Sequence, residues 1–183
     1  MLQIEFLCVT EKDKFMIAAG GNRVKIVNLG SGEQVFEHSI SDEANTEIAS
    51  MTAMDGFCLI TSWNGMIKVL NLRRLEWTEL ASENDEAAVS SAVDKLILRG
   101  VTGGSEGTVR GWNIVNGSLL FVGRASDRDI DAVSCVNGHI ATGCREGVIR
   151  LWSWTGQQLK VLPELQWVSY TKKYFVTIMS HCR

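Results

Sequence analysis

Proline, histidine and patterned cysteine are nearly absent from this sequence of 183 residues. It contains one proline and three histidines, and its five cysteines form no C-x-x-C pair. An odd, scattered set of cysteines argues against a disulfide framework and against a zinc finger or ribbon. We therefore expect reduced and mostly buried thiols, with no metal and no cofactor.

The sequence also lacks a membrane-spanning or signal segment and a basic net charge, and these two absences limit where the protein is expected to be and what it is expected to bind. No apolar run approaches the ~18 residues that a membrane-spanning helix needs, and no signal-peptide pattern is present. The default location is therefore intracellular, in the cytoplasm or the nucleus, with no membrane partner. The formal net charge of −3 provides no general attraction to nucleic acid, whose binders carry a basic stripe. Direct nucleic-acid binding is not expected.

Catalytic motifs are missing as well. The glycine-rich run at residues 103–107 lacks the Gly-Lys-Ser/Thr ending of a phosphate-binding loop, and no helical pattern follows it. No Gly-x-Ser-x-Gly elbow marks a nucleophilic serine. We expect no catalytic residues, and the chain is not predicted to be an enzyme.

An internal repeat is the main positive signal. Residues 102–112, TGGSEGTVRGW, recur at residues 142–152 as TGCREGVIRLW, with six of eleven positions identical. Weaker copies occupy residues 19–27 and 61–70. One column of the repeat is basic in all copies: Lys25, Lys68, Arg110 and Arg150. The surrounding alternation of apolar and polar positions is typical of a half-buried strand.

Each copy lies within a larger unit of about 40 residues. An apolar segment, a short turn and a second segment come first, followed by the glycine-containing turn, the basic-column segment, another turn and a last segment. Turn pairs such as Asp55-Gly56 and Asn137-Gly138 accept the positive φ that tight hairpins require. Helical periodicity is absent. The pattern predicts four antiparallel strands in each unit and an all-β fold.

The units resemble WD repeats, the modules of WD-repeat β-propellers. In that family the basic-column strand ends in Trp-Asp, after a glycine-containing turn that bears an acidic residue. The Trp-Asp site here reads Val27-Asn28, Leu70-Asn71, Trp112-Asn113 and Trp152-Ser153. The turn acid is replaced by Asn22, Asn64, Glu106 and Glu146. The family's Gly-His before the first strand is missing. Its loss implies less tightly fixed blades, although Asn and Glu can still cap the turn.

The resemblance implies one partial β-propeller over residues 1–183, made of four-stranded antiparallel blades. The expected blades cover about residues 1–41, 46–82, 87–125 and 130–163, and half of a fifth covers residues 165–180. WD-repeat propellers generally need more blades than this to close, and closure removes exposed sheet edges. Three accounts of the shortfall stay open. The sequence is a fragment, a second copy or another chain completes the ring, or the blades form an open arc.

Acidic residues gather in the linkers between units. The linkers contain Asp42, Glu43 and Glu47, then Glu83, Asp85 and Glu86, and then Asp127, Asp129 and Asp131, opposed locally only by Arg128. In a propeller these linkers share one face, and a surface of one charge attracts a partner of the other. We hypothesise that these acids, with Trp63 in its turn, bind a basic segment of a protein partner. The simpler alternative is that these are solvated loops.

The resemblance implies a non-catalytic protein–protein interaction scaffold. One narrower alternative is a substrate-receptor subunit of a cullin-type ubiquitin ligase, although Leu70-Asn71-Leu72-Arg73 keeps only the arginine of that docking element. Another is a scaffold in an RNA-processing or ribosome-assembly complex. An enzymatic propeller would draw its groups from the first strand of each blade. Those strands offer Ser50, Ser90, Ser91, Ser134 and Cys135.

Overall fold

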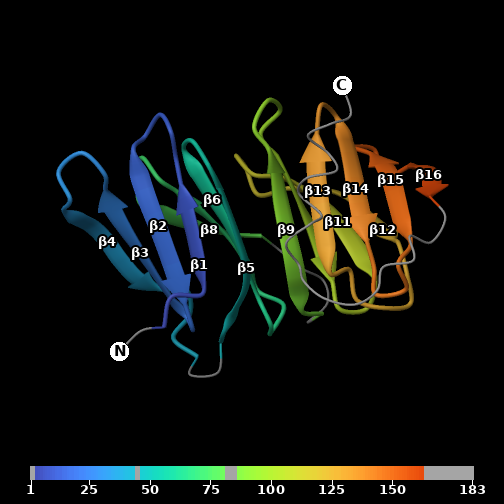
Figure 1. The fold of residues 1–183 in the computed structure, drawn as a ribbon, viewed down its shortest axis with the longest axis horizontal. Coiled ribbons are helices and arrows are strands. Elements are labelled where there is room, and N and C mark those ends of the chain that lie inside the picture. The colour runs from blue at the N-terminus through green and yellow to red at the C-terminus, as the bar shows by residue number, and fades with distance from the viewer. Residues whose placement is uncertain (1–2, 44–45, 81–85, 163–183) are drawn as a thin grey trace.

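The computed structural model describes residues 3–43, 46–80 and 86–162, which form four antiparallel β-sheets (Figure 1). Sheet 1 contains β1 (Phe6–Val9), β2 (Phe15–Gly20), β3 (Arg23–Asn28) and β4 (Gln34–Ser39). Sheet 2 contains β5 (Ile48–Met54), β6 (Phe57–Ser62), β7 (Ile67–Asn71) and β8 (Glu76–Leu80). Sheet 3 contains β9 (Ala88–Asp94), β10 (Arg99–Gly104), β11 (Thr108–Asn113) and β12 (Leu119–Arg124). Sheet 4 contains β13 (Ala132–Val136), β14 (His139–Gly143), β15 (Ile149–Ser153) and β16 (Gln158–Leu162).

The four sheets confirm the prediction of an all-β fold made of four-stranded antiparallel blades. In every sheet the strands lie in chain order from one edge to the other. The first strands contact one another from sheet to sheet, β1 with β5, β5 with β9 and β9 with β13. Figure 1 shows the sheets side by side along the longest axis of the molecule. The expected half blade at residues 165–180 lies outside the described residues.

Apolar side chains form three separate cores, one between each pair of neighbouring sheets. The core between sheets 1 and 2 includes Ile17, Ile26 and Leu70. The core between sheets 2 and 3 includes Leu59, Val69 and Trp112, and that between sheets 3 and 4 includes Val101 and Trp152. Successive strand residues point to opposite faces, so Leu70 packs toward sheet 1 while Val69 packs toward sheet 3. Each inner sheet therefore contributes to two cores.

Two core tryptophans are also tied to their own sheets by hydrogen bonds. Trp112 Nε1 donates to Thr102 Oγ1 at 3.0 Å, and the equivalent bond in sheet 4 joins Trp152 to Thr142 at 3.0 Å. In sheet 2 the place of the tryptophan is taken by the apolar Leu70. Sheets 3 and 4 thus fix this buried position by a polar contact, whereas sheet 2 fixes it by apolar packing alone.

The connections define two opposite faces of the molecule. On the face that we call the turn face, the first and third turns of a sheet bond to each other: Leu29 N–H donates to Lys14 O in sheet 1, Leu72 N–H to Gly56 O in sheet 2, and Ile114 N–H to Leu98 O in sheet 3. On the face that we call the linker face, the second turn of a sheet meets a linker: Ile40 N–H donates to Asn22 O and Ala125 N–H to Gly107 O.

Acidic side chains on the turn face join neighbouring sheets. Asp13 accepts a hydrogen bond from Gly56 N–H in the next sheet, and Asp94 Oδ2 accepts one from Gly138 N–H at 3.3 Å. Both glycines have positive φ, 87° at Gly56 and 81° at Gly138, a region that glycine enters without steric cost. The tight turn that closes a hairpin therefore also presents an N–H to the preceding sheet.

We expect Thr102→Val to lower the free energy of unfolding by about 1–3 kcal/mol, because it leaves the buried Trp112 Nε1–H without its acceptor. Chemical denaturation followed by tryptophan fluorescence measures the change. Thr61→Val is the matched control, since Thr61 Oγ1 is buried and has no hydrogen-bond partner among the described residues. That control should be neutral or stabilising. Equal destabilisation by the two variants would contradict the role given to the Trp112–Thr102 bond.

Candidate functional site

The first linker brings three acidic side chains and a tryptophan together on the linker face. Asp42, Glu43 and Glu47 are exposed, and the Trp63 side chain is 51% exposed. Trp63 N–H donates to Glu47 O at 3.0 Å. Asn64 Nδ2 reaches Glu43 Oε2 at 3.4 Å. The structure therefore groups these four residues, which we call the first-linker patch: Asp42, Glu43, Glu47 and Trp63.

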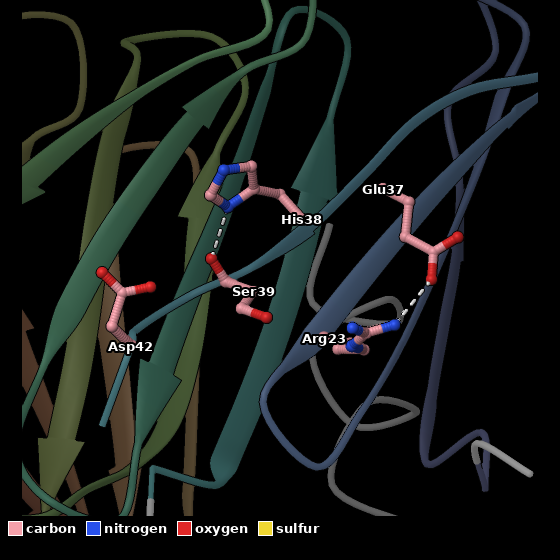
Figure 2. A pocket seen from close by; sticks show the side chains of 5 residues that line it. All are labelled: Arg23, Glu37, His38, Ser39 and Asp42. Carbon is pink, nitrogen blue, oxygen red and sulfur yellow. Dashed lines mark hydrogen bonds and ion pairs between the residues drawn. The ribbon is translucent and has the colours of Figure 1, made fainter. Parts of the chain in front are cut away.

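Two shallow depressions lie next to this patch. Both are lined mainly by residues just before the patch in the sequence, from β4 and the start of the first linker. One, of about 410 Å³, is lined by Arg23, Glu37, His38, Ser39 and Asp42. Figure 2 shows Arg23 paired with Glu37, and His38 with its ring nitrogen Nδ1 2.7 Å from Ser39 O. The second, of about 450 Å³, runs from His38 to Glu43 and includes Lys68 and Trp77. The two depressions share His38, Ser39 and Asp42. They form an open groove that begins on sheet 1 and continues between the outer strands of sheets 1 and 2.

Charge pairing distinguishes the groove from the patch. Arg23 and Lys25 contact Glu37 at 3.1 Å and 3.4 Å, and the pKa of Glu37 is lowered, mainly by its hydrogen bond to Lys25. Lys68 Nζ donates to Ile40 O at 2.7 Å and lies 3.6 Å from Glu79. The cations of the groove are thus already engaged. No salt bridge in the described part of the chain involves the three acids of the first-linker patch.

The third linker differs from what the sequence suggested. Its acids were expected to be opposed only by Arg128, but two other arginines neutralise them. Arg124 contacts Asp127 at 3.0 Å. Arg145 contacts Asp129 at 3.2 Å and Asp131 at 3.5 Å. Arg145 comes from the turn between β14 and β15, which the fold places beside this linker. The third linker is therefore largely charge-compensated.

Glu86 of the second linker is not part of an acidic surface. Its side chain is 3% exposed and forms an ion pair with Arg110, whose side chain is 5% exposed, at 3.1 Å. Glu86 Oε1 also accepts Glu106 N–H at 2.7 Å. The structure corrects two expectations here. The buried Glu86, rather than Glu106 itself, caps the turn between β10 and β11. The other two acids of this linker, Glu83 and Asp85, lie outside the described residues.

A glycine makes room for the Glu86 carboxylate. A Cβ at Gly104 would lie 2.0 Å from Glu86 Oε1, a separation that no side chain tolerates. The second glycine of the Thr102-Gly103-Gly104 run, which could suggest a phosphate loop, thus provides space for an internal carboxylate. This close approach is a structural reason for glycine at position 104.

We expect Glu86→Gln to lower the free energy of unfolding by roughly 3–5 kcal/mol, because it leaves the Arg110 charge buried without its partner. Thermal or urea denaturation provides the measurement. Glu86→Met combined with Arg110→Met should recover much of the loss, since replacing both members of a buried pair removes the unpaired charge. Asp127→Asn, in an exposed pair, should change little. A small loss in Glu86→Gln would show that the pair is not important for stability.

The first strands of the sheets were the expected source of groups for an enzymatic alternative. Ser50 Oγ lies 2.8 Å from Ser91 Oγ, and Ser90 Oγ donates to Ile130 O at 2.6 Å. These hydroxyls therefore join neighbouring sheets and linkers. Burial, with a smaller effect from the carboxylate of Asp94, raises the pKa of Cys135 to about 12. A thiol with so high a pKa is a poor nucleophile at neutral pH.

Alkylation kinetics test this description of Cys135. Because its pKa is about 12 rather than 9.0, its thiolate fraction near pH 8 should be roughly 1,000-fold lower in the folded chain than in the unfolded chain. We expect slow labelling of Cys135 by iodoacetamide in buffer and rapid labelling in urea, followed by peptide mass spectrometry. Rapid labelling of the native chain would instead indicate an activated thiol.

The described residues contain no group of three or more His, Cys, Asp or Glu side chains arranged to hold a metal ion. Within the same ranges, no helix is long and apolar enough to cross a membrane. The arginine on which the ligase-receptor alternative rests, Arg73, lies 3.6 Å from Asp13 of the neighbouring sheet. It therefore takes part in a contact between sheets.

No protein-family model and no curated protein matches the chain. Solved structures are similar to it. The computationally designed Ika8 protein superposes with a TM-score of 0.75 at 21% identity over 92% of the chain. The U3-55K structure gives 0.72 at 15% identity over 87%. The RRP9 WD40 repeats give 0.72 at 15% identity over 88%. The chain spans 53%, 54% and 53% of these three structures, respectively. These matches confirm the prediction of a partial propeller fold with WD40-like blades.

Proposed function

We propose that the chain is a non-catalytic protein-interaction scaffold of the WD40 type that holds a basic segment of a partner on the first-linker patch. The observation that carries the proposal is the contrast between linkers. Asp42, Glu43 and Glu47 are exposed and lack salt bridges in the described part of the chain. The acids of the third linker are paired with arginines. Among the linker acids that the structure describes, the attraction for a basic partner is therefore strongest at the first linker.

The composition of the patch suits lysine or arginine side chains. Three carboxylates raise the rate at which a cationic segment associates and fix its position. The indole of Trp63, half-exposed beside Glu47, can receive a cation on its face. The open groove that runs on toward His38 and Trp77 gives an extended segment room to continue past the patch.

Two narrower roles receive no added support from the site. For the ligase receptor, Arg73 is engaged with Asp13 in the fold itself. For an RNA-processing or ribosome-assembly scaffold, the supporting likeness is one of fold at 15% identity. The general scaffold is thus the function that the geometry supports best.

The test compares two matched charge reversals. Asp42→Lys, Glu43→Lys and Glu47→Lys together should weaken binding of a lysine- and arginine-rich peptide by roughly tenfold or more, because they replace attraction with repulsion. Fluorescence anisotropy at low and at physiological ionic strength measures the affinity. Trp63→Ala should weaken it by roughly two- to fivefold, as expected for an exposed cation–π contact.

The triple reversal of Asp127, Asp129 and Asp131 is the control. It changes the formal charge equally, but at acids that Arg124 and Arg145 already neutralise, so its effect on peptide affinity should be much smaller. If the two triple variants bind the peptide equally well, the first-linker patch is not the binding site.

A further inference from the structure

The turn between β9 and β10 is apolar, whereas the corresponding turns of the other sheets are polar. Sheets 2 and 4 use Asp55-Gly56 and Asn137-Gly138 at this place. Sheet 3 uses residues 95–98, in which Leu96 is 79% exposed, Ile97 41% and Leu98 39%. Exposed aliphatic side chains next to one another are disfavoured in water and usually mark a contact surface. Comparison with the equivalent turns of the other sheets therefore shows that the repeat does not require exposed aliphatic residues at this turn.

This apolar turn is held in one shape. The buried Asp94, 3% exposed, accepts Leu96 N–H at 3.0 Å through Oδ1. Ile114 N–H donates to Leu98 O at 3.3 Å. Leu98 has a φ of 53°, a left-handed conformation that favours glycine. The structure therefore fixes the aliphatic side chains outward, at some conformational cost.

Other exposed aliphatic residues share the turn face. Val115, in the third turn of sheet 3, is 55% exposed, and Leu29, in the third turn of sheet 1, is 49% exposed. The backbone bonds from Leu29 to Lys14 and from Ile114 to Leu98 place both turns on this face. The exposed apolar groups of the turn face thus come from turns of sheets 1 and 3, and the three consecutive ones are in the turn between β9 and β10. Other exposed aliphatic residues lie singly or in pairs on β1 and on the outer strands β4, β12 and β16.

Basic residues share this face as well. The exposed cations of its turns are Lys12, Lys14, Arg73, Arg74 and Lys95. The acids of the same turns are Glu11, Asp13, Glu33 and Asp55. Asp13 and Asp55 accept backbone hydrogen bonds from the neighbouring sheet's turn. The turns at residues 72–75 and 95–98 carry three of the cations and no acid, and of these three Arg73 pairs with Asp13 of sheet 1 while Arg74 and Lys95 have no salt bridge in the described part of the chain. The five cations and four acids leave a small positive excess on this face, opposite in sign to the acidic first linker.

We infer that the turn face contacts an anionic lipid bilayer, with Leu96, Ile97 and Leu98 inserted at the boundary between headgroups and acyl chains. Apolar side chains that enter this boundary, together with cations near anionic headgroups, are what peripheral membrane binding requires. A bilayer is favoured over a protein pocket because a planar surface reaches side chains spread over turns of several sheets at once.

A membrane contact was not anticipated from the sequence, where the missing membrane-spanning segment suggested no membrane partner. A peripheral contact needs no spanning segment. The inference is independent of the proposed function, because the first-linker patch lies on the opposite face and would stay accessible to a partner.

Sedimentation with vesicles tests the inference. The chain should pellet with vesicles of phosphatidylcholine mixed with phosphatidylserine, and much less with phosphatidylcholine alone. Leu96→Asp with Ile97→Asp should reduce the bound fraction by roughly tenfold, since it removes the inserted groups and adds negative charge. Arg74→Glu with Lys95→Glu should reduce binding to the mixed vesicles by a similar factor.

Val122→Asp is the matched control. Val122 is 56% exposed on the outer strand β12, away from the turns, so its replacement should leave vesicle binding unchanged. Circular dichroism checks that each variant is folded. Absence of binding to the mixed vesicles, equal binding to both vesicle types, or full binding by the Leu96/Ile97 variant would overturn the inference. So would self-association, detected by light scattering, that the Leu96/Ile97 variant abolishes, because a second copy would then cover the turn.

Discussion

Burial of apolar surface between adjacent sheets is the interaction on which the rest of this structure depends. A single four-stranded sheet has no interior, so Ile26 of sheet 1 and Val69 of sheet 2 leave water only because the next sheet covers them. The strand register and the close turns serve this face-to-face stacking. Surface features such as the first-linker patch take their positions from it, since each linker runs from the last strand of one sheet to the first strand of the next.

Polar contacts hold linkers and turns at defined positions in this packing, because hydrogen bonds and ion pairs depend on geometry and apolar contacts do not. The Glu86–Arg110 pair fixes the second linker against the turn of sheet 3, and the Asp13–Gly56 bond fixes one hairpin turn to the next. The four sheets do not share one scheme. Trp112 is hydrogen bonded in sheet 3, whereas Leu70 holds the same place in sheet 2. Degenerate repeats can therefore keep one backbone arrangement although the buried side chains, and the hydrogen bonds that satisfy their polar atoms, differ from sheet to sheet.

The repeat and the turn residues were enough to predict the sheets, because a turn such as Asn137-Gly138 and the alternation around Arg150 are local properties of the chain. The charge pairing was not predictable in this way. Glu86 meets Arg110, and Arg145 meets Asp129, only after the strand register and the stacking of sheets bring distant segments together. The linker acids looked equivalent in the sequence, and only the fold divides them into exposed, paired and buried members.

Nearest-neighbour stacking also has a kinetic consequence. Sheet 1 contributes to one of the three cores, and its first strand leaves Leu7 and Val9 60% and 57% exposed. Sheet 3 contributes to two cores and holds the buried ion pair. In such quasi-linear assemblies, local opening starts where the fewest interfaces must break. Sheet 4 likewise contributes to one core. Amide protons should therefore exchange with solvent sooner in sheets 1 and 4 than in sheets 2 and 3, and the molecule should loosen progressively from its outer sheets rather than all at once.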